Sequence, residues 1–77
     1  MTYGIKPTSY QVQTKIFEAA GCTYVRTRGD HLIYHHPGAI RPVVIPKYKE
    51  VPVFIIRNNM KIIGMSVEQY LSLLETV

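Results

Sequence analysis

The stretch CTYVRTRGDHLIYHHPG, residues 22–38, decides the fold, because it holds two strand-like runs joined by a tight turn. Residues 22–27 are rich in β-branched and aromatic side chains, which favour strands. Residues 28–30, Arg-Gly-Asp, have the composition of a turn. Residues 31–36 then alternate again. The sequence therefore predicts an antiparallel hairpin centred on the Arg-Gly-Asp turn.

The alternation in the second run sorts its side chains between two faces of the sheet. One face receives Leu32, Tyr34 and His36, and the other receives His31, Ile33 and His35. A second turn signal follows at residues 37–38, Pro-Gly. Residues 41–45 read as a third short strand that Pro46 closes. Three strands in this order predict an antiparallel meander.

The segment before the hairpin has the pattern of a helix over residues 9–20. Thr8 and Gln11 have the spacing of a capping box, and Gly21 is placed to end the helix. The apolar residues that recur at helical spacing are Val12, Ile16, Ala19 and Ala20, and Phe17 lies next to Ile16.

Two further helices follow the strands. Residues 52–63 begin with a β-branched run that also suits a strand, but Pro52 fits the first position of a helix and Gly64 its end. Ser66 and Gln69 form a second capping box that starts a last helix. The order αβββαα is an α+β fold, with helices on one face of the sheet and the other face open to solvent or to a partner.

Length and composition set further limits. A chain of 77 residues is one domain, residues 1–77, and buries only about 60% of its unfolded surface, so a homodimer or a partner chain would add stability. The sequence has neither an apolar run of roughly 20 residues, as a bilayer span needs, nor the pattern of a signal peptide. Cys22 is the one cysteine, so no internal disulfide is possible, which favours a reducing cytoplasm.

The positive charge lies mainly in the middle of the chain. The formal net charge is +4, and residues 26–61 hold seven basic residues against only Asp30 and Glu50. The basic residues are Arg26, Arg28, Arg41, Lys47, Lys49, Arg57 and Lys61. A basic middle indicates a polyanionic partner such as nucleic acid, while the alternative is a surface that only keeps a small domain in solution.

The three histidines do not have the spacing of a metal site. His31 and His35 share a strand face, but four strand positions put their Cα atoms roughly 13 Å apart, and metal–nitrogen bonds are near 2 Å. No serine is tied to a histidine, and no two carboxylates pair. What remains is His31 beside arginines, which is enough chemistry to cleave RNA. The alternative is a surface histidine without a role.

The run VRTRGDHLIYHHPG, followed by VVIP at residues 43–46, resembles HicA, the toxin of HicA–HicB toxin–antitoxin modules. In that family a helix ends in glycine and an apolar residue, here Gly21-Cys22. Arginines precede a Gly-Ser-His or Gly-Asp-His motif, here Gly29-Asp30-His31. A Val-x-x-Pro strand and two helices follow, so the resemblance covers nearly the whole chain from about Thr8.

The resemblance implies a fold like that of double-stranded-RNA-binding domains and the activity of an mRNA interferase that needs neither metal nor other cofactor. It makes His31 the catalytic residue and a HicB-type antitoxin the partner that masks it. The assembly is then a toxin–antitoxin hetero-oligomer, and the alternative is a homodimer of the toxin. The glycine of the motif lets the turn bring His31 close to the RNA backbone. The candidate RNA-binding residues are Arg26, Arg28, Gly29, Arg41 and Lys47.

The sequence departs from the family pattern at three places. Asp30 stands where serine is commoner, and its carboxylate both repels phosphate and can orient the ring of His31. Tyr48 stands where a second histidine is often found, so a helper there would be a phenol or would be absent. Residues 51–53, Val-Pro-Val, replace a family glycine.

These departures leave two other functions open. One is an RNA-binding module of the same fold that does not cleave, whose salt-sensitive binding would survive loss of His31. The other is a protein-interaction domain that uses only the open sheet face. A neighbouring gene for a small acidic antitoxin would favour the toxin.

Overall fold

The computed structural model describes residues 4–77 and has the element order that the sequence predicts. The elements are α1 (Tyr10–Ala19), β1 (Thr23–Arg28), β2 (His31–His35), β3 (Val43–Pro46), α2 (Val53–Ile63) and α3 (Val67–Thr76). The strands form one antiparallel sheet in the order β1-β2-β3, so the α+β class and the meander are confirmed.

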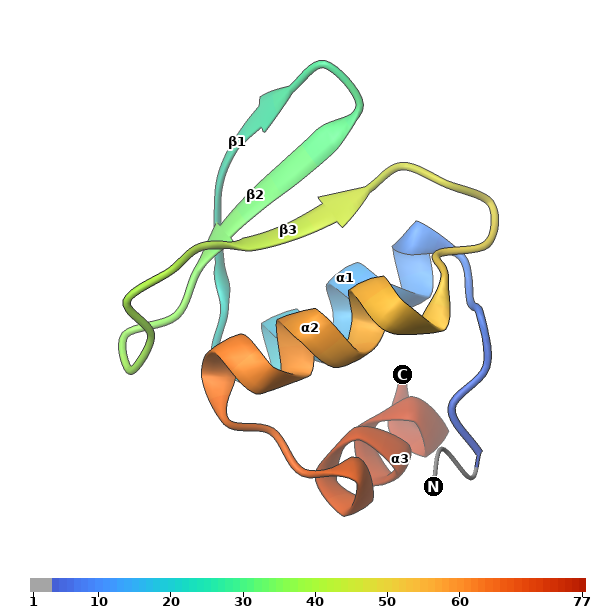
Figure 1. Cartoon of the computed structure of the whole chain (residues 1–77). Coiled ribbons are helices and arrows are strands. Elements are labelled where there is room, and N and C mark those ends of the chain that lie inside the picture. The colour runs from blue at the N-terminus through green and yellow to red at the C-terminus, as the bar shows by residue number, and fades with distance from the viewer. Residues whose placement is uncertain (1–3) are drawn as a thin grey trace.

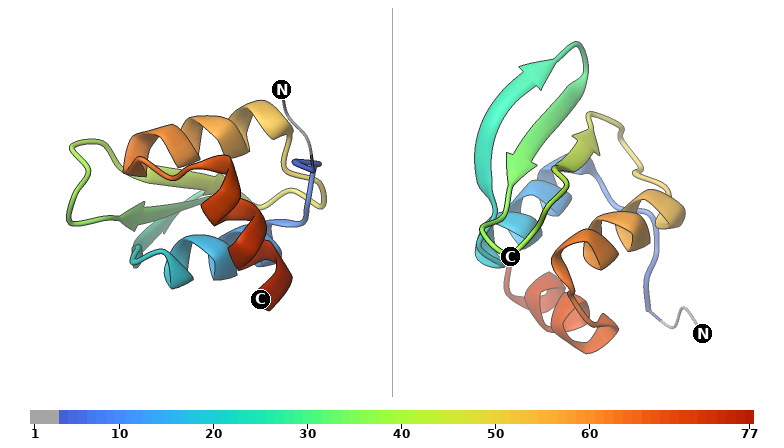
Figure 2. Two further views of the ribbon diagram at one scale, coloured as in Figure 1. Left: turned by 90° about the horizontal axis from the view of Figure 1, so that it is seen from below. Right: turned by 60° about the vertical axis from the view of Figure 1, so that its left-hand side comes forward.

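The helices lie on one side of the sheet. α1 and α2 lie against it and α3 lies beneath both, on the side away from the strands (Figure 1). The views in Figure 2 show that the hairpin of β1 and β2 projects beyond the helices. As a result β3 is almost wholly buried, while all six residues of β1 are exposed. The predicted cover of helices therefore reaches only part of the sheet.

Local signals set the ends of the helices. Gly21 and Gly64 both have positive φ, +102° and +69°, a conformation that a side chain disfavours. The N–H of Cys22 donates back to the Phe17 carbonyl, 2.9 Å, and that of Met65 to the Met60 carbonyl, 2.8 Å. The predicted capping box of α3, at Ser66 and Gln69, is present with both of its hydrogen bonds.

The start of α1 differs from the prediction. Ser9, not Thr8, is the N-cap, and its hydroxyl accepts from the N–H of Val12. Thr8 is held in extended backbone by a bridge to Val51, and its hydroxyl accepts instead from the side chain of Gln13. A contact with a distant segment thus competes with the local cap and moves it by one residue.

Two other boundaries also shift. Pro52 has extended backbone and is the N-cap of α2, so it lies one position before its predicted place. β3 begins at Val43, because the preceding Pro42 has no N–H to contribute to the ladder. Among residues 4–77 there is no helix whose length and apolar content would let it cross a membrane.

The core lies where β3 meets the three helices. The buried side chains there include Ile16 and Phe17 of α1, Ile45 of β3, Ile56 of α2 and Tyr70 of α3. A polar group sits among them: the buried Gln13 amide donates to the Tyr70 hydroxyl at 2.7 Å and to Thr8. Burial raises the pKa of the Tyr70 phenol. This pair links α1 to α3 across 57 residues of sequence.

Asn59 joins α2 to the free edge of the sheet. Its side chain is buried, donates to the Val44 carbonyl at 2.9 Å and accepts from the Val44 N–H at 3.4 Å. β3 is an edge strand, so the amide of Asn59 satisfies main-chain groups that would otherwise be unpaired inside the protein.

We expect Asn59→Ala to lower the free energy of unfolding by about 1–3 kcal/mol, the usual cost of leaving a buried polar group without its partner. The neighbouring Asn58 is exposed, so Asn58→Ala is the matched control and should change stability by less than about 0.5 kcal/mol. Urea denaturation followed by circular dichroism measures both values. Equal effects of the two substitutions would show that the contacts with Val44 do not stabilise the fold.

The buried phenol of Tyr34 should make the folded protein less stable at alkaline pH. Burial of its ring, with the hydrogen bond to Glu18 and that carboxylate's charge, raises the pKa of the Tyr34 phenol far above its usual value. The unfolded chain ionises near pH 10, and the folded chain only at higher pH. The contribution of Tyr34 to the free energy of unfolding is therefore complete below about pH 10. It is lost as the pH rises through the pKa of the phenol in the folded state.

We expect Tyr34→Phe to lower the free energy of unfolding by about 1 kcal/mol at neutral pH, because the hydrogen bond is lost. Above pH 10 its stability should decline less steeply than that of the wild type. Tyr48 is exposed, so Tyr48→Phe should keep the wild-type decline. Urea denaturation at a series of pH values tests this, and an equally steep decline in Tyr34→Phe would contradict it.

Candidate active site

His31 is the first residue of β2 and directly follows the turn at the tip of the projecting hairpin. Gly29 in that turn has φ +59°, and no atom lies within 4 Å of where a Cβ would be. Glycine is therefore needed for its backbone conformation and not for lack of space. The Asp30 carbonyl accepts from the Lys47 N–H at 2.7 Å, which ties the turn to the end of β3.

Asp30 contacts the imidazole ring of His31. Its Oδ1 lies 3.0 Å from Nδ1, and both side chains are about half exposed. A carboxylate only accepts hydrogen bonds, so this contact places a hydrogen on Nδ1. The neutral ring then carries its free lone pair on Nε2, which is available as a proton acceptor. The orienting role expected of Asp30 agrees with this geometry.

The register of the hairpin sets which side chains share a face with His31. Arg28 is paired with His31, and Arg26 with Ile33, two positions along the same strand. Residues paired across antiparallel strands point to the same face. Arg26, Arg28 and His31 therefore lie together on the face of the sheet that points away from the helices.

A β-bulge between Tyr24 and Arg26 makes this arrangement possible. Regular alternation would put Tyr24 on the same face as the two arginines. With the extra residue, Val25, Tyr24 is instead paired with Tyr34, whose ring it meets edge-on at 5.7 Å. The aromatic pair faces the helices and the arginines face solvent. No feature of the sequence predicts this bulge.

His31 borders two hollows. One, of about 440 Å³, is also lined by Arg28 and Gly29. The other, of about 630 Å³, lies between β3 and α2 and is also lined by Arg41 and Tyr48. The structure thus brings three of the five candidate RNA-binding residues beside His31. Arg26 and Lys47 line neither of these two hollows. Arg26 nevertheless lies on the same face of the sheet as His31, and the main-chain N–H of Lys47 holds the turn at Asp30.

Sequence reasoning did not select two residues that line the larger hollow, Phe54 and Asn58. The sequence did contain a signal for Phe54. The residue is apolar, yet it falls outside the helical stripe of Val53, Ile56, Met60 and Ile63, so it is an apolar side chain on the exposed side of the helix. Its ring is 73% exposed, as its position off the buried face requires.

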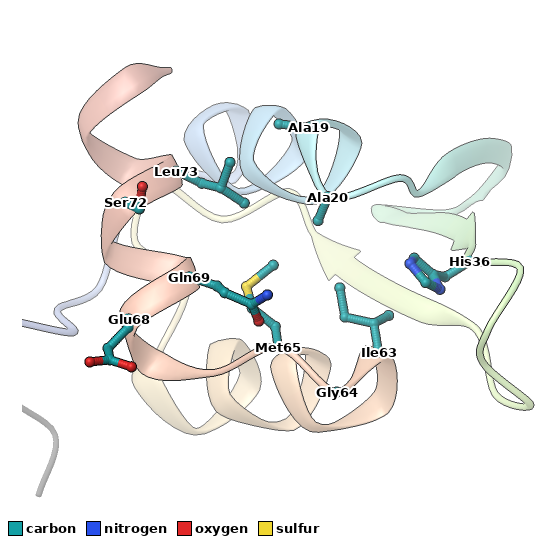
Figure 3. A pocket seen from close by; sticks show the side chains of 10 residues that line it. All are labelled: Ala19, Ala20, His36, Ile63, Gly64, Met65, Glu68, Gln69, Ser72 and Leu73. Atoms are coloured by element: carbon teal, nitrogen blue, oxygen red, sulfur yellow. The ribbon is translucent and has the colours of Figure 1, made fainter.

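The other two histidines are separate from this site. His35 is exposed on the same strand, whereas His36 points into a cavity of about 570 Å³ between α1, α2 and α3 (Figure 3). His36 Nδ1 accepts from the N–H of Gly38 at 3.0 Å. Within residues 4–77 no three histidine, cysteine or acidic side chains are grouped so that they could hold a metal ion.

The family model described as the HicA toxin of bacterial toxin–antitoxin matches residues 13–65, which include every residue placed at the site above. No curated protein matches the chain.

The contact between Asp30 and His31 predicts the tautomer of the ring. In ¹⁵N–¹H spectra at about pH 9, where imidazole is ordinarily neutral, His31 should carry its hydrogen on Nδ1. Asp30→Ala should move the population toward the Nε2–H form, while His35 serves as an internal control and should not change. An unchanged tautomer at His31 would show that Asp30 does not orient the ring.

Proposed function

This chain belongs to the HicA family of toxins from bacterial toxin–antitoxin systems, and on that basis we propose that it is an RNA endonuclease whose catalytic residue is His31. The observation that carries the proposal is the oriented, half-exposed imidazole at 3.0 Å from Asp30. The cross-strand arginine Arg28 lies on the same face. A proton acceptor beside fixed positive charge is what cleavage of a phosphodiester by its own 2′-hydroxyl requires.

In the proposed reaction, Nε2 of His31 takes the proton from the 2′-hydroxyl of the RNA. The 2′-oxygen attacks the adjacent phosphorus, and the bond to the 5′-oxygen breaks. The products are a 2′,3′-cyclic phosphate and a 5′-hydroxyl. The leaving 5′-oxygen takes up a proton, for which the phenol of Tyr48, in the same hollow as His31, is the candidate donor. Proton exchange with water then returns His31 to its neutral form and Tyr48 to its phenol.

Arg28 and Arg41 have the second role in this scheme. Each lines one of the two hollows that His31 borders, so a phosphate at His31 would lie next to two hollows that each have an arginine in their lining. Guanidinium groups bind phosphate oxygens in a forked geometry and stabilise the charge that develops at phosphorus. Because side chains supply both the proton transfer and the positive charge, the proposed reaction needs no metal ion.

The proposed partner is a HicB-type antitoxin that covers the face around His31. The net charge of +4 and the arginines on the projecting hairpin favour an acidic protein. A protein bound there would cover His31 and both hollows at once, which would inhibit cleavage without any change in the toxin itself. The toxin and antitoxin would then form a hetero-oligomer.

We expect the purified protein to cleave single-stranded RNA in excess chelator, and His31→Ala to lower the rate by about 10²–10⁴-fold, the usual contribution of a general acid–base group. His35→Ala is the matched control, because His35 is an exposed histidine of the same strand, and it should keep the wild-type rate. Product analysis by gel and mass spectrometry should detect the cyclic phosphate.

Three other outcomes would overturn the proposal. If the wild type binds RNA in low salt but does not cleave it, the chain is a binding module of the same fold. If His31→Ala cleaves as fast as the wild type, His31 is not the catalytic residue. If chelator stops cleavage, the reaction depends on a metal ion.

A further inference from the structure

The hollow between β3 and α2 has one wall, formed by α2, that has no role in the proposed cleavage. On the β3 side it is lined by His31 and Arg41, and on the α2 side by Phe54 and Asn58. Its volume of about 630 Å³ lies within the range of small-ligand sites. Phe54 leaves 73% of its surface in water. A large aromatic side chain at the rim of a hollow offers a flat apolar face to a ligand that binds there.

Helical geometry explains why the wall of α2 is separate from the core. Phe54, Asn58 and Ile62 are spaced four residues apart, so they form one stripe along α2. Ile56, Asn59 and Met60 are buried and form the stripe that packs on the sheet and on the other helices. The two hydrogen bonds between Asn59 and Val44 join this buried stripe of α2 to β3. Phe54 and Asn58 therefore line the hollow from a helix that is joined to the sheet.

The charge of the hollow selects the class of ligand. Its lining includes the guanidinium of Arg41 and the imidazole of His31, and no acidic residue among the described ones. A ligand that fits must combine an anionic group with a flat apolar face and polar edges. An unpaired nucleotide has all three: its phosphate suits Arg41, its base stacks on an aromatic ring, and the edge of the base suits a carboxamide.

We propose that this hollow binds an unpaired base of the RNA, stacked on Phe54 with its edge against the amide of Asn58, next to the phosphate held at His31 and Arg41. The inference rests on the proposed function and deepens it, because it assigns the residues that choose the base beside the cleaved bond. Phe54 supplies affinity for any base, and Asn58, with one acceptor and two donors, distinguishes among bases.

A tryptophan reporter tests the stacking directly. The sequence contains no tryptophan, so Phe54→Trp introduces a single tryptophan into the hollow, whose fluorescence can be excited apart from that of the tyrosines. The probes are 2′-O-methyl oligonucleotides, which lack the attacking hydroxyl and stay intact, and matched abasic chains of the same length. We expect oligonucleotides with bases to quench the fluorescence to saturation at low salt, and abasic chains to quench it far less.

The matched control is Tyr24→Trp, since Tyr24 is another exposed aromatic residue but lies on the opposite face of the sheet, outside the hollow. Its fluorescence should not respond to the presence of bases. If both tryptophan variants respond alike, or if abasic chains quench as well as chains with bases, the hollow binds no base and the proposal is wrong.

Affinity measurements give the second test. We expect Phe54→Ala to weaken binding of the base-containing oligonucleotides at least about five-fold, as loss of one stacked base does. Ile40→Ala removes a fully exposed apolar side chain outside the hollow, and should leave affinity unchanged. Asn58→Ala should change the order in which homopolymers of A, C, G and U bind. Circular dichroism confirms that each variant is folded.

The two proposals fail in different ways. If oligonucleotides quench the Phe54→Trp reporter but the wild type cleaves no RNA, the base site stands and the nuclease proposal falls. If the wild type cleaves RNA, and Phe54→Ala and Asn58→Ala bind and cleave the same sequences equally well, the nuclease stands and the base site is wrong. In that case the exposed wall of α2 serves a protein partner instead.

Discussion

The two hydrogen bonds between the Asn59 side chain and the main chain of Val44 are the contact on which the geometry of the site depends. A carboxamide has the same donor and acceptor as a peptide group, so Asn59 pairs with β3 as a neighbouring strand would. This closes one edge of a three-stranded sheet without a fourth strand. It also joins β3 to α2, the helix whose Phe54 and Asn58 line the hollow beside His31.

The fold divides into a packed body and a projecting hairpin. The body contains β3, α1, α2 and α3, with a polar group at its centre in which Gln13 contacts both Thr8 and Tyr70. Of the hairpin, β2 supplies the buried Tyr34 to the core, whereas β1 contributes little, because it is exposed along its whole length. Residues that do not need to be buried are free to carry charge, and this is where Arg26, Arg28 and His31 lie. The exposed face of the hairpin and the candidate chemistry therefore coincide.

The same division explains why one face suits both proposed ligands. An RNA strand needs positive charge, an aromatic surface and an oriented proton acceptor, all on a surface that is open to solvent. An antitoxin that inhibits by covering that surface uses the same charge and the same exposed apolar groups. Competition between the two would follow from the small size of the domain, since both proposed ligands use the one exposed face around His31.

The sequence by itself determined the order of the elements and most of their ends. The glycines at positions 21, 29 and 64 and the capping box of Ser66 and Gln69 act through neighbouring residues, so their effects can be read from spacing and residue type alone. The alternation of β2 in the same way separated His31 from Leu32 and Tyr34. The resemblance to the HicA family, carried by local motifs around His31, was confirmed by the family match.

Only the tertiary structure decided the features that depend on contacts between distant segments. The bridge from Thr8 to Val51 moved the cap of α1 to Ser9. The bulge at Val25 depends on how β1 pairs with β2, and it places the arginines opposite the Tyr24–Tyr34 pair. The hollow depends on the packing of α2 beside β3, which places Phe54 on the same surface as His31, a distant residue of the chain. Local rules encode dihedral angles and spacing, whereas a surface shared by separate elements depends on the packing of the whole chain.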